Sequence, residues 1–474
     1  MDAYLSENLC HDPIHGYIRF VSSEAVAPKG NAEREICERD IIDNPWVQRM
    51  RQIRQLQTAW WVFPTAEHTR FQHILGVMHL ASRTLERLYG SLCQADPATP
   101  PLPYVDLLMR MAGLLHDIGH GPFGHFFDAH YLSHFQLTHE TLGAQIIEHE
   151  LGDRLRQLRR SPAGHLPAGV SIDPRRVAWL IQRPTAATMD SDREQPRWLH
   201  LLRSLFCGIY TVDNMDFVLR DAYMTGLNPR AFDLQRITHY SFFRPEGLTI
   251  YDRGMPALVH FLSMKAELFR NVYFHRTVRA IDLELADLFR ESRQHLFPGD
   301  PREHLTEYLG LTEFSLLTDV RRWANSYDPK LQKLGARWRE WLQRRVPWVM
   351  VCQRSVSFAE DRAEASSIFS SSRVFAEVIR DRLPADLKSL PFRVDLARHM
   401  HRPHTAGATA GMNYYFDSAS GNLRRLSMHE LYRLLPVSHT LVRVYAHNQI
   451  YQRPIAMILD ELVGSVAIDD ATNM

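Results

Sequence analysis

The stretch of sequence that decides the fold is residues 107–128, LLMRMAGLLHDIGHGPFGHFFD. It begins as an almost uninterrupted apolar run, typical of a buried helix, and then presents His116 and Asp117. Buried ionisable side chains need a partner or a metal, and imidazole together with carboxylate suits a divalent ion. His116 and His120 share one helical face if the helix continues that far, and Gly121-Pro122 then ends it. Any one of these histidines could be an ordinary hydrogen-bonded side chain, but the whole cluster favours a metal site.

The composition is that of a globular protein. The chain has 474 residues, of which 45% are hydrophobic and 23% charged, and this length predicts two or three domains. Lys and Arg number 55 against 54 Asp and Glu, so the net charge of +1 provides no global basic field for nucleic acid. Local basic patches remain possible, because net charge does not describe distribution.

Cysteine usage and the absence of targeting signals point to a cytoplasmic protein. The five cysteines are widely spaced, odd in number and without a CxxC pair, which argues against a zinc ribbon or a disulfide framework. The N-terminus lacks the basic and apolar regions of a signal peptide, and no apolar run reaches 18 residues. We therefore expect no membrane span and a reducing compartment.

Periodicity along the chain predicts a mostly α fold with a smaller α+β C-terminal part. DPIHGYIRF, residues 12–20, reads as a turn leading into a strand, and Asp43 followed by Pro45 reads as a helix N-cap. A helix is expected to begin near Thr138, and strands are expected near 248–251 and 440–445. Further helical patterns cover residues 74–89, 198–226, 256–291 and 295–347, and loops are expected at 91–104 and 399–411.

Two distant positions could complete a metal site with His116 and Asp117. His73 stands at the start of an expected helix, and Asp213 begins a stripe of one helical face that continues to Asp221. Carboxylates on such an apolar stripe need a cation, either a metal or an arginine. For Asp221 an internal ion pair with Arg220 or another arginine is an equally good explanation.

The spacing of these residues resembles the HD superfamily of metal-dependent phosphohydrolases. The longer agreement is with the deoxynucleoside triphosphate triphosphohydrolases, a branch that includes dGTPases and the vertebrate sterile-alpha-motif/HD enzyme. Most specific is the core HDIGHGPFGH, residues 116–125. The other matching pieces are DPIHG (12–16), VFPTAEHTRFQHILGVMHLA (62–81), THE (138–140), VDNMDFVLRDAYMTG (212–226) and VYFHRTVRAID (272–282).

The resemblance implies a fold and a division of the chain. It predicts an HD-type helical bundle with an N-terminal β-like segment over residues 1–290, a helical connector over 291–350, and an α+β assembly lobe over 351–474. It also implies a homo-oligomer, whether dimer, tetramer or hexamer, a nucleotide substrate and a nucleotide activator.

The resemblance also assigns residue roles. A divalent ion (Mn, Fe, Ni, Zn or Mg) would be held by His73, His116, Asp117 and Asp213. The catalytic group would comprise His139 paired with Glu140, together with His120 and Asp128. Substrate contacts would come from Gln55, Arg70, His125, Asn214, Phe217, Asp221, Tyr273, His275 and Arg276. Asp43, Gln48 and Arg51 match activator contacts, although Asp43 as a helix cap and Arg51 as a surface charge explain them equally well.

Departures from the vertebrate pattern keep other substrates open. Asn214 and Asn271 stand where that enzyme has basic residues near the phosphates, and Phe217 replaces a tyrosine. A charged hydrogen bond is worth about 1.5–3 kcal/mol, so two lost cations would weaken triphosphate binding. The alternatives are a nucleotide phosphatase or phosphodiesterase acting on mono-, di-, cyclic or ribonucleotides, and a nucleic-acid-binding module that uses the arginines of residues 321–345. A solvated helical face explains those arginines better than nucleic acid does.

Overall fold

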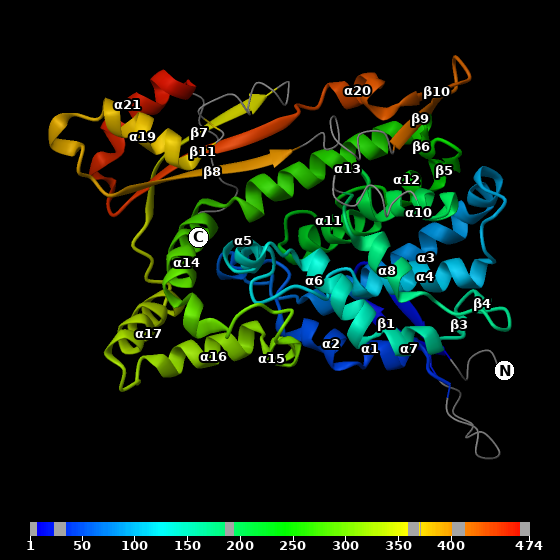
Figure 1. The fold of residues 1–474 in the computed structure, drawn as a ribbon. Helices are drawn as coiled ribbons and strands as arrows, with labels where there is room; N and C mark the ends of the chain where they lie inside the picture. Colours follow the sequence, from blue (N-terminus) through cyan, green and yellow to red (C-terminus); the bar gives the residue numbers. More distant parts are fainter. Residues whose placement is uncertain are drawn as a thin grey trace.

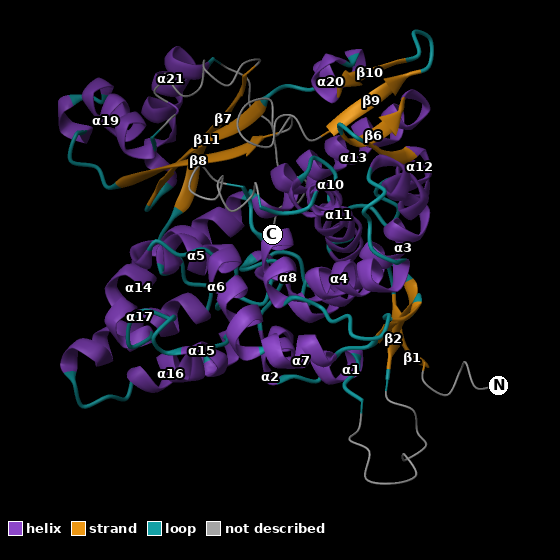
Figure 2. Cartoon of the chain, turned by 45° about the vertical axis from the view of Figure 1, so that its right-hand side comes forward, coloured by secondary structure: helices purple, strands orange, loops and turns teal. Residues whose placement is uncertain are grey.

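The computed structural model describes residues 7–22, 35–184, 194–358, 369, 371–400 and 413–464. Helices form most of the molecule and the strands gather in small sheets, which confirms the predicted mostly α fold class (Figure 1). Figure 2 shows the helices packed in the body of the molecule, with the sheets at its edges. The chain folds this way because most of its apolar residues recur at helical spacing.

Two long helices form the centre of the large core. α3 (Arg70–Ala95) packs along α4 (Leu102–Leu115), whose residues from Tyr104 onward are all buried. The two backbones approach closely at Gly113, where an added Cβ would lie 3.0 Å from the Cα of Met78. α11 (Val212–Met224) packs against α3 on another side. Two of these helices, α3 and α11, and the turn that follows α4 carry the predicted metal ligands.

The central helix ends earlier than the sequence suggested. α4 stops at Leu115, and residues 116–119 turn, with the backbone N–H of His120 donating to Asp117 O. The prediction that His116 and His120 share one helical face is therefore wrong. The turn brings Gly119 against α6, where an added Cβ would lie 2.1 Å from the carbonyl oxygen of His139. Only glycine allows this close approach.

The elements after this turn complete the wall of the site. α5 spans His125–His130, and α6 spans His139–Gln145 with Thr138 as its N-cap, which confirms the helix start predicted near Thr138. The predicted helix over 198–226 is instead two helices, α10 (Arg197–Cys207) and α11.

The helix predicted over residues 256–291 is interrupted. α13 (Met255–Leu268) passes into a π-helical turn at Phe269–Tyr273, and α14 (Arg276–Leu296) begins after His275. The side chain of His275 accepts the N–H of Thr277 and so caps the new helix. Turns of this kind commonly lie at functional sites. Here Phe269 and Tyr273, the first and last residues of the turn, line the same cavity.

The N-terminal region corrects one predicted cap. Asp43 ends α1 (Glu38–Ile42), whereas Asn44 caps α2 (Pro45–Gln48) by accepting the N–H of Trp46. The predicted turn and strand form a hairpin of β1 (Glu7–Asp12) and β2 (Gly16–Val21). This hairpin packs beside α3.

Within the described residues, the strands form four small sheets. β5 (Ser241–Arg244) and β6 (Gly247–Tyr251) join β9 (Asn413–Asp417) and β10 (Asn422–Arg425) in the order β10-β9-β6-β5. β7 (Val349–Phe358), β8 (Phe392–Met400) and β11 (Ser438–Ala446) form an antiparallel sheet with β11 in the middle, which confirms the strand predicted near 440–445. Two hairpin strands, β3 (Arg160–Ser161) and β4 (Gly164–His165), lie near α4.

The C-terminal sheet encloses a second hydrophobic core. α19 (Ser372–Arg382) and α21 (Gln452–Val463) pack on β8 and β7, and their apolar side chains form a cluster separate from the large core. The remaining helices are α7 (Gly152–Gln157), α8 (Pro174–Ile181), α12 (Leu234–Tyr240), α15 (Leu305–Gly310), α16 (Glu313–Trp323), α17 (Pro329–Leu342) and α20 (Glu430–Arg433). The division of the chain at residues 290 and 350 stays a prediction, and most of the expected loop at 399–411 lies outside the described residues.

None of the helices in the described ranges combines the length and the apolar composition needed to cross a bilayer.

Candidate active site

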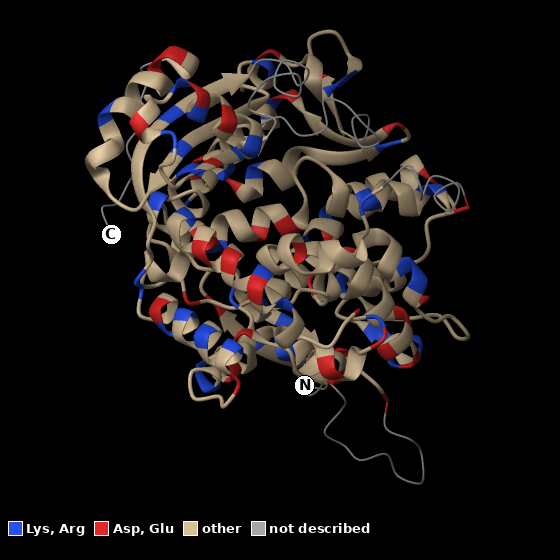
Figure 3. Ribbon diagram, turned by 60° about the vertical axis from the view of Figure 1, so that its left-hand side comes forward, with Lys and Arg blue, Asp and Glu red and all other residues tan. Residues whose placement is uncertain are grey.

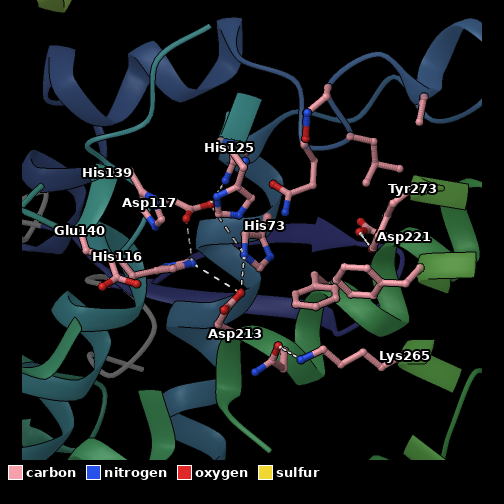
Figure 4. Close-up of a pocket in the computed structure, with 18 of the residues that line it drawn as sticks. His73, His116, Asp117, His125, His139, Glu140, Asp213, Asp221, Lys265 and Tyr273 are labelled. Atoms are coloured by element: carbon pink, nitrogen blue, oxygen red, sulfur yellow. Dashed lines mark hydrogen bonds and ion pairs between the residues drawn. The ribbon is translucent and has the colours of Figure 1, made fainter. Parts of the chain in front are cut away.

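A cavity of about 400 Å³ opens where α3, α6, α11 and α13 meet the turn after α4. Its wall includes all four predicted metal ligands, together with His125, His139, Gln55 and Tyr273. Figure 4 shows the four predicted ligands at the centre, with His139 and Glu140 on one side and Asp221 and Tyr273 on the other. The structure therefore gathers four predicted ligands that are as many as 140 positions apart in the chain.

The predicted ligands His73, His116, Asp117 and Asp213, called the ligand cluster below, lie at distances that suit one shared ion. His73 Nε2 lies 3.1 Å from Asp213 Oδ1 and 3.9 Å from Asp117 Oδ2. His116 Nε2 lies 3.4 Å from Asp117 Oδ1 and 3.7 Å from Asp213 Oδ1. Two imidazoles and two carboxylates form a donor set for a divalent transition metal or for magnesium.

The remaining atoms of the two histidines show that this donor set fits a metal. His73 Nδ1 lies 2.7 Å from Asp216 Oδ2, and His116 Nδ1 lies 2.9 Å from the carbonyl oxygen of Gly113. Metal-binding histidines almost always use their second nitrogen in this way. His116 Nε2 is buried and has no hydrogen-bond partner, as expected of an atom that holds an ion.

The charges around the ligand cluster perturb one another. Burial disfavours the ionised form of Asp117, but Arg70, whose guanidinium contacts its carboxylate, and the neighbouring histidines hold its pKa well below the usual range. Burial likewise disfavours protonated His73, yet hydrogen bonds to Asp213 and Asp216 raise its pKa to about 10. Without a metal, the cluster therefore attracts a proton in place of the cation.

His139 is oriented by a different carboxylate from the one that the sequence suggested. Its Nδ1 lies 2.6 Å from Asp128 Oδ2, whereas Glu140 binds Arg183, with Arg183 Nε 3.1 Å from Glu140 Oε1. The predicted pairing of His139 with Glu140 is therefore wrong. Burial, and then the neighbouring His120, lower the pKa of His139.

His120 and His125 frame this pair. The ring of His120 stacks on that of His139 with 3.8 Å between centroids, and His125 Nδ1 lies 3.3 Å from Asp128 Oδ2. His125 lines the cavity, but His120 is fully buried behind His139, with Nε2 3.4 Å from Asp117 Oδ1. His120 thus touches both the ligand cluster and His139 without reaching the cavity wall.

The opposite side of the cavity carries a polar group suited to a sugar. Asp221 accepts the hydroxyl of Tyr273 at 2.6 Å and lies 2.8 Å from His68 Nε2. The expected ion pair between Asp221 and Arg220 is absent: Arg220 instead binds Asp216. Gln55 lines the same wall, and its Oε1 is buried without a hydrogen-bond partner.

Some predicted substrate contacts lie elsewhere. His275 is buried outside the cavity wall, and Arg276 lines a neighbouring hollow beside Trp348. Asn271, predicted to have replaced a phosphate-binding cation, is buried and does not line the cavity. Asn214 and Phe217 do line it, as predicted.

The sequence analysis missed a cation at this site. Lys265 on α13 lines the cavity, and its ammonium donates to Asn214 Oδ1 at 2.7 Å (Figure 4). Burial lowers its pKa to about 8, with Asp213 opposing the shift and Arg183 adding to it. The available signal was a single lysine directly after the mostly apolar run MPALVHFLSM, residues 255–264. The other charged lining residues that were missed are Arg183, Arg279 and Asp282.

The three predicted activator residues lie on a separate surface. Asp43 pairs with Arg39 at 3.3 Å, Gln48 donates to the carbonyl oxygen of Ile42, and Arg51 donates to Gln48 Oε1. Asp43 and Arg51 are exposed. Their role in activation stays a prediction.

The arginine-rich segment packs on the large core and forms ion pairs with acidic side chains. Trp338 and Trp341 of α17 are buried in the large core, and Arg337 pairs with Glu284 and Glu291. Figure 3 shows the positions of Lys and Arg interspersed with those of Asp and Glu along the ribbon. These observations favour the explanation of a packed helix with a solvated face.

Comparisons with known proteins place this site in a family. The family model described as HD domain matches residues 70–189. YwfO of Bacillus subtilis, an uncharacterized protein, is 28% identical over 70% of this chain and 70% of its own length. The deoxynucleoside triphosphate triphosphohydrolase SAMHD1 of Homo sapiens is 24% identical over 92% of this chain and 70% of its own length. The SAMHD1 homolog of Dictyostelium discoideum is 28% identical over 62% of this chain and 53% of its own length.

A solved structure shares the fold. The crystal structure of a hypothetical protein from Aquifex aeolicus superposes with a TM-score of 0.65 and 22% identity, covering 95% of this chain and 99% of that one. The chain spans about half the length of the Dictyostelium discoideum homolog and of the Bos taurus enzyme. The HD match over residues 70–189 contains three members of the ligand cluster, and Asp213 follows it. Residues 70–189 therefore match the HD domain family, and the chain as a whole is similar to proteins named deoxynucleoside triphosphate triphosphohydrolases.

Proposed function

We propose that this chain hydrolyses deoxynucleoside triphosphates to deoxynucleoside and inorganic triphosphate with the help of a divalent metal. The observation that carries the proposal is the ligand cluster in the wall of a cavity that four cationic side chains also line, namely Arg70, Arg183, Lys265 and Arg279. Relatives named deoxynucleoside triphosphate triphosphohydrolases support this choice of substrate. The metal is manganese, iron, nickel, zinc or magnesium.

The ligand cluster would hold the metal, which supplies Lewis-acid polarisation of a phosphoryl oxygen and a more acidic bound water. His139 carries the proton that must pass from the attacking water to the nucleoside 5′-oxygen as the bond from that oxygen to the α-phosphorus breaks. Asp128 fixes the ring by accepting its Nδ1–H, which leaves Nε2 to exchange the proton. The reaction consumes one water, and one proton moves from the water oxygen to the nucleoside 5′-oxygen.

The remaining cavity residues bind and orient the substrate. His125, Arg70 and Lys265 offer donors to the phosphate oxygens. Gln55 Oε1 lacks a partner and Asp221 is already held by Tyr273, so together they present acceptors to a sugar 3′-hydroxyl. Phe217 and Phe269 add apolar surface beside them.

The charge of the cavity favours a triphosphate over smaller substrates. The sequence suggested that Asn214 and Asn271 had removed two cations, but Lys265 contacts Asn214 directly, so a cation lies at that position. Arg183 adds a second cation beside Glu140. A mono- or diphosphate, a cyclic nucleotide or a ribonucleotide remains the alternative that the product assay below distinguishes.

Regulation and assembly follow as further parts of the proposal. We infer a homo-oligomer, dimer, tetramer or hexamer, activated by a nucleotide at the surface of Asp43, Gln48 and Arg51. The five cysteines are all unpaired, which supports a cytoplasmic setting.

The test is a product assay. Purified protein is incubated with Mn²⁺ or Mg²⁺ and each dNTP, NTP, dNMP and cyclic nucleotide, and the products are resolved by anion-exchange chromatography. Deoxynucleoside with inorganic triphosphate is the expected result. Orthophosphate from mono- or diphosphates with triphosphates untouched would overturn the proposed substrate, and no hydrolysis by metal-loaded protein, with or without GTP and dNTPs as activators, would overturn the reaction.

A further inference from the structure

We propose that Asp216 and His15 are positioning residues for the metal ligand His73, so that the N-terminal hairpin forms part of the support of the metal centre. The inference rests on the proposed metal site. It explains residues that the reaction itself does not use, namely the turn DPIHG at 12–16 and the second carboxylate of α11.

Asp216 is the hub of this arrangement. The residue is fully buried, and both of its carboxylate oxygens are occupied. His73 Nδ1 lies 2.7 Å from Oδ2, and His15 Nε2 lies 2.6 Å from Oδ1. Arg220 donates to both oxygens at 2.9 Å. Four donors saturate the lone pairs of one carboxylate, so its orientation is fixed.

This saturation determines which nitrogen of His73 faces the ligand cluster. The carboxylate of Asp216 accepts hydrogen bonds and donates none, because Arg220 keeps it ionised. His73 Nδ1 must therefore carry the hydrogen, and Nε2, 3.1 Å from Asp213 Oδ1, presents its lone pair when the ring is neutral. That is the tautomer that a metal requires.

The hairpin supplies the fourth donor through a preorganised turn. Asp12 Oδ1 accepts the backbone N–H groups of Ile14 and His15 at 2.9 Å each, which fixes the turn between β1 and β2. Asp12 Oδ2 accepts Arg220 Nη1 at 2.7 Å, so the turn is also tied to α11. The side chain of His15 is 5% exposed, and its ring is thereby held against Asp216.

Close packing leaves Asp216 no alternative position. α3 crosses α11 at Gly76, where an added Cβ would lie 2.1 Å from Asp216 Oδ1 and 2.3 Å from Arg220 Nη2. Loss of the His15 donor leaves one oxygen held by Arg220 alone. Mutation of the outer-shell partner of a metal-binding histidine commonly weakens metal binding about 10–100-fold, so we expect a loss of that order here.

The experiment measures metal affinity without any nucleotide. Metal-free full-length protein competes with a fluorescent chelator for Mn²⁺, and the dissociation constant is compared between wild type and His15→Gln. We expect binding about 10–100-fold weaker in the variant. Asp216→Asn, which keeps the size of the side chain but loses its charge, is expected to weaken binding at least as much.

The matched control is His79→Gln. His79 lies on α3, and its ring is 5.5 Å from the ring of His15 in the hairpin. Among the described hydrogen bonds, His79 makes none to Asp216. Its Mn²⁺ affinity should equal that of wild type. The melting temperature of each metal-free protein is measured in parallel, because a purely structural role lowers that temperature without changing the affinity of the folded protein.

The outcomes separate the two proposals. Wild-type affinity in a folded His15→Gln protein overturns the positioning role and leaves the metal site intact. If His15→Gln does not fold, the Mn²⁺ affinity of Asp216→Asn is compared with that of the control His79→Gln. Wild-type affinity in both proteins overturns the positioning role. Wild-type protein that binds no Mn²⁺, Fe²⁺, Ni²⁺, Zn²⁺ or Mg²⁺ overturns the metal site itself, and the inference with it.

Discussion

His139 Nδ1 lies 2.6 Å from Oδ2 of Asp128, eleven residues earlier in the chain, while the adjacent Glu140 binds Arg183 instead. A carboxylate in this position holds the imidazole in the orientation and tautomer needed for proton transfer. Asp128 lies on α5 and His139 is the first residue of α6. The fold brings these two side chains within hydrogen-bonding distance.

Asp128→Asn should therefore lower kcat far more than Glu140→Gln. Positioned proton transfer contributes about 10²–10⁴-fold, and an asparagine can present the wrong group to Nδ1. We expect a fall of at least about 100-fold for Asp128→Asn, with its bound metal retained, and less than about fivefold for Glu140→Gln, whose carboxylate faces Arg183. Steady-state kinetics with metal analysis checks this, and the reverse order of effects would restore Glu140 as the partner.

Removal of a metal ligand should abolish both metal binding and turnover. In His116→Ala and Asp117→Ala the ligand cluster loses one of its four donors, and we expect no bound metal after dialysis and no measurable hydrolysis. The fold should persist, with an unchanged circular dichroism spectrum. His260→Ala, on the exposed face of α13, is the control and should keep its metal. Turnover by the His116→Ala/Asp117→Ala double variant would disprove the assignment.

The pKa of Lys265 predicts an alkaline limit to substrate binding. Burial lowers this pKa to about 8, so the ammonium loses its charge, and its attraction for phosphate, as pH rises above about 8. The KM for the nucleotide should rise between pH 7 and pH 9.5, by about tenfold or more for a charged hydrogen bond. The kinetic pH profile measures this rise.

Two substitutions at Lys265 isolate that group. Lys265→Arg stays charged throughout this range, so the rise in KM should move out of it. Lys265→Met should raise KM at every pH and remove the part of the pH dependence that belongs to this side chain. A profile identical in wild type and Lys265→Arg would show that Lys265 does not contact the substrate.

Two glycines of α3 predict opposite effects of alanine. At Gly76 an added Cβ would lie 2.1 Å from Asp216 Oδ1, and such overpacking costs about 1–3 kcal/mol. At Gly90 an added Cβ meets nothing within 4 Å, and alanine in a helix is favoured by about 0.5–1 kcal/mol. Thermal unfolding should thus show a lower melting temperature for Gly76→Ala and a slightly higher one for Gly90→Ala. Equal effects would refute the close approach of α11 at Gly76.

Much of the fold and the candidate ligands could be predicted from local signals. Apolar periodicity predicted the helices near α3, α4 and α11, Thr138 predicted the start of α6, and alternating residues predicted β11. Residue chemistry proposed the ligand cluster, and the structure gathers its four members. These predictions succeed because periodicity and capping act over a few residues.

The sequence by itself determined which side chains could serve a metal site and which segments would be helices or strands. Only the tertiary structure decided that Asp128 serves His139, that Lys265 contacts Asn214 across 51 positions, and that His15 reaches Asp216 across 201. Helix α4 also ended at Leu115, before the expected end at Gly121-Pro122, and the turn that follows it packs against α6. The physical reason is range: caps and periodicity depend on sequence neighbours, whereas a buried charge takes the partner that packing brings within hydrogen-bonding distance.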